Sequence, residues 1–194
     1  MKTAIGQQIE FSSVLFDTLF GLILFFSIDS FLDIKDPLHF IFYLFSLIVL
    51  IHRRLIFKSC DDAFDKEVTD SGLDIIIGII ELILIEYVVL MARGFDTVST
   101  AYFLLALLGV DLIWTIIWLY VGKRRHEDKE RIKSMERELQ NNLKLVIAGI
   151  IMFTILIAFA QFLSPLLFII GFIVLYSVFI VLSFRNKIVD IKIF

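Results

Sequence analysis

The sequence predicts an all-α, polytopic membrane protein with six transmembrane helices and both chain ends in the cytoplasm. Three observations predict this class. Of 194 residues, 59% are apolar and 20% are charged, against about 45–50% and about 25% in soluble domains. The apolar residues form long unbroken blocks, which favour helices over alternating strands. Lysine and arginine gather at every second junction between the blocks, as expected of a chain that crosses a membrane repeatedly.

Six apolar blocks are long enough to cross a hydrocarbon core about 30 Å thick, which takes about 20 helical residues. They comprise residues 11–32, 38–57, 73–92, 99–121, 145–162 and 165–184, within a single transmembrane domain of residues 1–194. The second block is the weakest, because His52, Arg53 and Arg54 interrupt it. Arginine near a helix end can extend its charge to the headgroups. Pro165 is placed as the first residue of the last helix.

The distribution of basic residues sets the expected orientation. With the N-terminus in the cytoplasm, 16 of the 18 lysines and arginines lie inside, and only Lys35 and Arg93 lie outside. This split agrees with the positive-inside rule and with an even number of spans. We therefore expect a multi-pass protein of the plasma (inner) membrane. Its single cysteine, Cys60, excludes an internal disulfide.

The only sizeable polar segment, residues 122–144, carries an amphipathic stripe. Ile132, Met135 and Leu139 recur at helical spacing within it, which predicts a helix with one apolar face. One interpretation is a cytoplasmic continuation of the fourth or fifth span. The other is a helix whose stripe docks another subunit or a cytosolic protein partner.

Four acidic residues inside the spans are candidates for an ion pathway: Asp17, Glu81, Glu86 and Asp111. Charges within a membrane are costly and call for a partner or a function. Glu81 and Asp111 lie near the midpoints of the third and fourth spans, so we expect them at one depth. Two neighbouring carboxylates in a low dielectric do not both ionise easily, which favours proton uptake by one of them. The alternative is hydrogen bonding to neighbouring helices, for example to Trp114 and Thr115.

Asp17 also matches Arg53 and Arg54 in depth, because the first two spans are antiparallel neighbours. The pattern predicts a structural Asp17–Arg53 or Asp17–Arg54 ion pair, with a gating role as the alternative. Phe16 and Phe20 are candidates for a hydrophobic constriction. Phenylalanine is equally typical of lipid-facing surface.

Motifs of enzymatic chemistry are absent from the sequence: it has no phosphate-binding loop, zinc-ligand spacing or nucleophile elbow. His39, His52 and His126 are scattered and are interpreted as interfacial residues. We therefore expect no enzyme activity, cofactor, metal site or nucleic-acid partner.

Part of the sequence resembles a known family. The residues concerned are Phe16-Asp17-Thr18-Leu19-Phe20-Gly21, Asp33-Ile34-Lys35, Tyr43-Leu44-Phe45-Ser46-Leu47, His52-Arg53-Arg54-Leu55-Ile56-Phe57, Ala101-Tyr102 and Trp118-Leu119-Tyr120. Their order is similar to that in the cation channels of the transmembrane protein 175 family. Leu15-Phe16-Asp17 stands where that family carries Phe-Ser-Asp. The resemblance implies six spans, tetrameric assembly around the first helix, and conduction of potassium or protons.

Two functions follow as hypotheses. The first is a small oligomeric channel or conduit for monovalent cations, assembled from copies of the chain in the lipid bilayer. The second is a non-conducting sensor or anchor subunit that recruits a cytosolic effector, for example in bacterial stress or phage defence.

Overall fold

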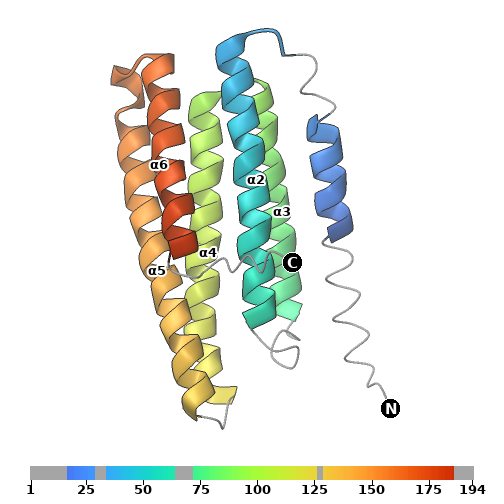
Figure 1. Ribbon diagram of the computed structural model, residues 1–194, viewed down its shortest axis with the longest axis vertical. Coiled ribbons are helices and arrows are strands. Elements are labelled where there is room, and N and C mark those ends of the chain that lie inside the picture. Colours follow the sequence, from blue (N-terminus) through green and yellow to red (C-terminus); the bar gives the residue numbers. More distant parts are fainter. Residues whose placement is uncertain (1–16, 29–33, 64–71, 126–128, 186–194) are drawn as a thin grey trace.

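The computed structural model describes residues 17–28, 34–63, 72–125 and 129–185, and within these ranges every regular element is helical (Figure 1). The predicted all-α class is therefore confirmed. An N-terminal helix, Asp17–Ile28, comes first. The remaining elements are α2 (Pro37–Ala63), α3 (Gly72–Arg93), α4 (Thr97–Arg125), α5 (Lys129–Ala158), a 3₁₀ turn (Ala160–Phe162) and α6 (Pro165–Arg185).

Three of these helices contain stretches long and apolar enough to cross a membrane: Thr97–Ile117, Leu139–Ala158 and Pro165–Arg185. Asp17–Ile28 and Pro37–Arg53 are shorter apolar stretches. Large apolar side chains cover the outside of the molecule on all of these helices. Soluble proteins rarely expose apolar surface of this extent to water, so the fold indicates a membrane protein.

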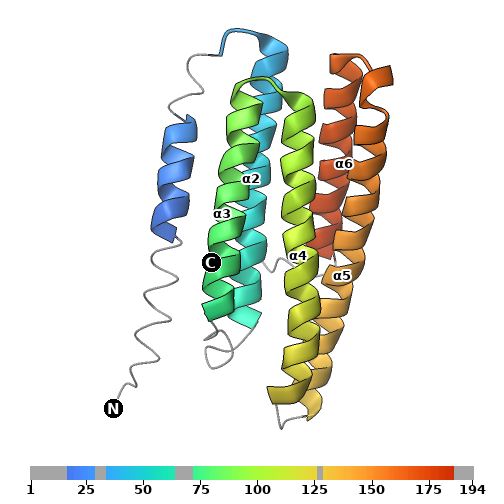
Figure 2. The same ribbon diagram turned by 180° about the vertical axis from the view of Figure 1, so that it is seen from behind.

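The helices α2 to α6 run side by side (Figures 1 and 2), and their contacts close them into a ring. Each helix packs against the next along the chain, and α6 packs back against α2. The N-terminal helix lies outside this ring, beside α2 and α3. We call the five ring helices the bundle.

Local sequence signals explain the turns at one end of the bundle. The Asp36 carboxylate accepts the His39 N–H at 2.8 Å, and Pro37 begins α2; both are typical of a helix start. Asp96 starts α4 in the same way, accepting the Ser99 N–H at 3.0 Å. The turn before it places Phe95 at a φ of 58°. These short turns hold consecutive helices antiparallel.

The bundle interior is rich in aromatic rings. Phe172 of α6 contacts Phe42 of α2 and Phe153 of α5, with ring centroids 5.4 and 5.6 Å apart in edge-to-face arrangements. Such pairs add about 0.5–1.5 kcal/mol beyond their burial. The core therefore joins α2, α5 and α6, which are distant in the sequence.

The polar segment 122–144 is divided between two helices: α4 continues to Arg125 and α5 begins at Lys129. Leu139, a candidate for partner docking, is 3% exposed because α5 packs on α4 at this level. It is therefore part of the bundle rather than of a docking stripe. The side chains of Ile132 and Met135 lie outside the described residues. The fifth helix ends at Ala158, before the predicted residue 162, since the chain enters the 3₁₀ turn.

Candidate functional site: a buried charge cluster

Three charged side chains meet inside the bundle, and we call them the charge cluster: Arg53 of α2, Glu81 of α3 and Asp111 of α4. The Arg53 Nη2 donates a hydrogen bond to the Asp111 Oδ1, and lies 3.8 Å from the Glu81 Oε1. All three residues are buried, with exposed fractions of 4%, 5% and 6% in that order. The prediction that Glu81 and Asp111 share one depth is confirmed, with an arginine between them.

The three members of the charge cluster are two acids and one base. One Arg53 charge cannot neutralise two ionised carboxylates, and isolated charge is expensive in a low dielectric. Two buried atoms of the cluster, Arg53 Nε and Asp111 Oδ2, have no hydrogen-bond partner among the described residues. Unsatisfied buried polar atoms are rare in folded proteins and call for an explanation. The Asp111 Oδ2 is therefore an acceptor atom at which this cluster can take up a proton.

In the structure Arg53 contacts Glu81 and Asp111, two acids that the sequence analysis proposes for an ion pathway. The sequence analysis predicts Asp17 as the partner of Arg53 instead. Asp17 lies exposed at the beginning of the N-terminal helix. The physical reason for the difference is that α3 and α4 bring their acids into the bundle interior, which Arg53 faces. The side chain of Arg54 lies outside the described residues, so a pair between Asp17 and Arg54 stays a prediction.

The other candidates lie away from the cluster. Glu86 is exposed on α3 and lines a groove beside the N-terminal helix. Phe20 is 9% exposed and packs against the bundle, so within this chain it faces the core rather than a pore. Phe16 lies outside the described residues.

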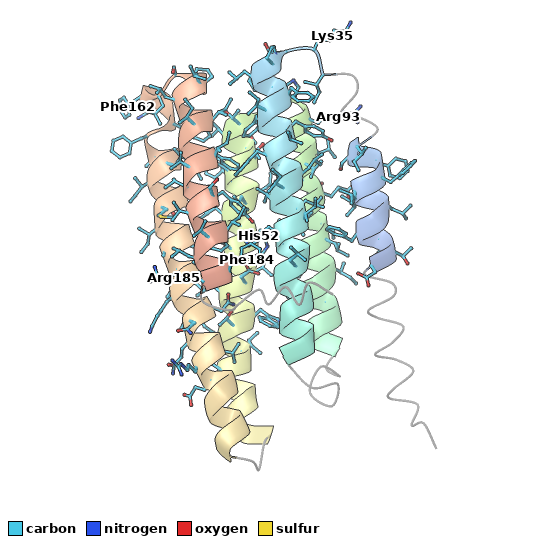
Figure 3. The ribbon with its side chains drawn as sticks, in the orientation of Figure 1. Lys35, His52, Arg93, Phe162, Phe184 and Arg185 are labelled. Carbon is cyan, nitrogen blue, oxygen red and sulfur yellow. The ribbon has the colours of Figure 1, made fainter. Side chains whose placement is uncertain are left out.

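A second polar group, the histidine cluster, consists of His52, Tyr176 and Ser183 and joins α2 to α6. His52 Nδ1 lies 3.1 Å from the Tyr176 hydroxyl, and His52 Nε2 lies 2.7 Å from the Ser183 Oγ. Figure 3 shows His52 between these helices, near Phe184, whose ring centroid is 6.0 Å from that of His52. His52 is 3% exposed, so it is buried between helices of the bundle.

Hydrogen-bond counting assigns the tautomer of His52. The Ser183 hydroxyl donates its one hydrogen to the Ile180 carbonyl at 2.7 Å, so it can only accept from His52. His52 Nε2 therefore carries the proton, and Nδ1 accepts from the Tyr176 hydroxyl. His52 directly precedes Arg53 in the sequence, so the two clusters are adjacent along α2. A histidine and an arginine together in an apolar stretch were the sequence signal for this arrangement.

One further polar contact lies a turn along α4 from the charge cluster. The Asn142 side chain of α5 donates to the Thr115 Oγ1 at 2.9 Å. Thr115 accepts this hydrogen bond from α5 and keeps its own hydroxyl hydrogen, so its pairing with an acid of a neighbouring helix stays a prediction. In the described part of the chain, no group of histidine, cysteine and acidic side chains is arranged to hold a metal ion.

Comparison with known proteins assigns no family: no family model matches the sequence, and no curated protein or solved structure matches it.

Proposed function

We propose that this chain is a small oligomeric conduit for cations in the plasma membrane, and that the cation its site suits best is the proton. The observation that carries the proposal is the charge cluster, in which two buried carboxylates approach the same Arg53 nitrogen. A proton carrier needs a buried acid that can change its protonation state. Asp111 Oδ2 is an available acceptor for that proton.

Potassium fits the charge cluster less well than a proton. Selective potassium sites replace the hydration shell with rings of oxygen atoms. The charge cluster offers two carboxylates whose charge is partly cancelled by an arginine, in a bundle interior of low exposure. A proton needs only an acceptor atom and a hydrogen-bonded path.

The proposal includes six membrane crossings with both chain ends in the cytoplasm. The asymmetry of the basic residues supports this topology. It also includes a closed homo-oligomer, as the resemblance to the transmembrane protein 175 family implies. The N-terminal helix supports assembly, because Phe25 is 66% exposed at the edge of the molecule. In a symmetric oligomer each copy would present this helix in the same way.

The experiment is a flux assay on the purified chain in liposomes. A pH gradient or a potassium gradient is imposed in separate reactions, with empty liposomes as the control. We expect proton flux above the control and a smaller or absent potassium flux. Asp111→Asn should abolish the proton flux, while Glu86→Gln, outside the cluster, should retain it. Flux that is equal in the protein and control liposomes, for both ions, would contradict the proposal.

A second candidate function, a sensor or anchor subunit, rests on a different observation. The helix α4 continues to Arg125, beyond the end of its apolar stretch at Ile117. The helix α5 begins at Lys129, before its apolar stretch starts at Leu139. This polar helical pair could hold a cytosolic partner. A stable complex recovered with the intact chain, together with absence of flux, would favour this function over conduction.

A further inference from the structure

A groove runs along one side of the molecule, between the N-terminal helix, α2 and α3. Its volume is about 460 Å³, within the range of about 300–1,000 Å³ typical of ligand sites. Most of the lining side chains are leucine, isoleucine and valine, and Phe26 and Tyr43 add two aromatic rings. Two charged side chains, Glu86 and Arg93, also line the groove. A site of this composition suits an amphiphile.

The α3 part of the groove has the length of a lipid tail. It extends from Ile79 to Arg93, which is about 21 Å at about 1.5 Å per residue. Half of a hydrocarbon core measures about 15 Å. The tail of a lipid from one leaflet can therefore lie along the groove with its polar end at Arg93.

The charges in the groove set the orientation of the occupant. Arg93 is the last residue of α3 and is exposed; Figure 3 shows it beside the upper end of the N-terminal helix. Glu86 lies two helical turns deeper on the same face, since seven residues make about two turns. A phosphate is attracted by the guanidinium and repelled by the deeper carboxylate. The polar end of an anionic lipid is thus held at the mouth of the groove.

The N-terminal helix forms a wall of the groove without closing it. Its contact with α2 includes one buried hydrogen bond, from the Tyr43 hydroxyl to the Ser27 carbonyl at 2.7 Å. Leu22 and Phe26 line the groove and remain 49% and 63% exposed. Their apolar surface is available to an acyl chain from the bilayer.

We propose that the groove is a specific binding site for an anionic phospholipid, with one acyl chain along α3 and the phosphate on Arg93. The site is independent of the proposed conduction, because it shares no residue with the charge cluster. It attaches the N-terminal helix to the bundle through a bound lipid.

Native mass spectrometry of the intact chain tests this site, with two probes in mixed detergent micelles. The probes are phosphatidylglycerol and a diacylglycerol with the same acyl chains but no phosphate. We expect retention of phosphatidylglycerol only. Arg93→Gln should weaken its retention about tenfold, since a charge-assisted hydrogen bond contributes more than a neutral one. Lys35→Gln, the other basic residue expected at this end, should have little effect.

A second pair of variants tests the apolar part of the groove. Ile83 lines it and is 48% exposed, whereas Ile80 is 40% exposed on the same helix and does not line it. Ile83→Trp should fill the groove and abolish retention, and Ile80→Trp should not. Equal retention of both probes, equal effects of the two tryptophans, or a stable dimer that covers the groove and excludes lipid would each overturn the proposal.

Discussion

The bundle and the N-terminal helix differ in which side chains they bury and which they leave exposed. The bundle gathers its polar groups inside, where Arg53, His52 and Asp111 find partners on other helices. The N-terminal helix lies outside the bundle and leaves Phe25 and Phe26 exposed. We therefore expect the N-terminal helix to depend on lipid or on another copy more than the bundle does. Each prediction below therefore compares a bundle site with a peripheral one.

The largest difference is expected between two arginines. Arg53→Met removes the partner of the buried Asp111 carboxylate, and removal of one partner of a buried ion pair costs about 3–5 kcal/mol. Arg93→Met changes an exposed residue and should cost less than about 1 kcal/mol. The free energy of unfolding in detergent micelles measures both. Adding Glu81→Gln and Asp111→Asn to Arg53→Met should restore part of the loss; equal stability of the two single variants would contradict the cluster.

Histidines give the next comparison. His52→Phe leaves the Tyr176 hydroxyl without its His52 acceptor, whereas Ser183 keeps its bond to the Ile180 carbonyl; a buried unsatisfied group costs about 1–3 kcal/mol. His39 contacts the Ala92 carbonyl at 3.1 Å near the end of the bundle, where water can replace it. We expect His39→Phe to cost about 1 kcal/mol or less. Thermal unfolding of the two variants in one detergent provides the measurement, and a larger loss for His39→Phe would oppose our assignment.

A pair of glycines tests packing with the smallest change. A Cβ on Gly149 would lie 3.0 Å from the Phe179 ring, whereas a Cβ on Gly21 has no neighbour within 4 Å. Gly149→Ala should therefore cost about 1–3 kcal/mol through overpacking. Gly21→Ala should be neutral or stabilise the helix by about 0.5–1 kcal/mol. Unfolding midpoints of the two variants check the prediction; destabilisation by Gly21→Ala would show that the N-terminal helix is closely packed.

Sequence patterns predicted the helices well, because an apolar block about 20 residues long has few alternatives to a helix. They also predicted the common depth of Glu81 and Asp111, which follows from their places near the middle of neighbouring antiparallel spans. The partner of Arg53 was harder, since Asp17, Glu81 and Asp111 all match it approximately in depth. The choice depends on which helix faces turn inward. The contact of His52 with α6 joins residues 131 positions apart, and local periodicity carries no information on such a pairing.

The proposed role of the charge cluster depends on Glu81 being a titratable group of the proton path rather than a structural acid. Glu81→Gln keeps the hydrogen bond from Arg53 to Asp111, so we expect the stability of the fold to be retained. The same substitution removes a titratable group from the proposed proton path. Glu81→Asp, which keeps the carboxyl group, provides the matched control.

The most direct test measures stability and proton flux together for Glu81→Gln, in one preparation reconstituted in liposomes. Our account predicts an unfolding free energy within about 1 kcal/mol of the parent chain, as for a change that keeps the ion pair. It also predicts proton flux reduced at least about tenfold, with partial flux retained by Glu81→Asp. A destabilised variant whose flux per folded molecule is unchanged would contradict the account, because Glu81 would then be structural.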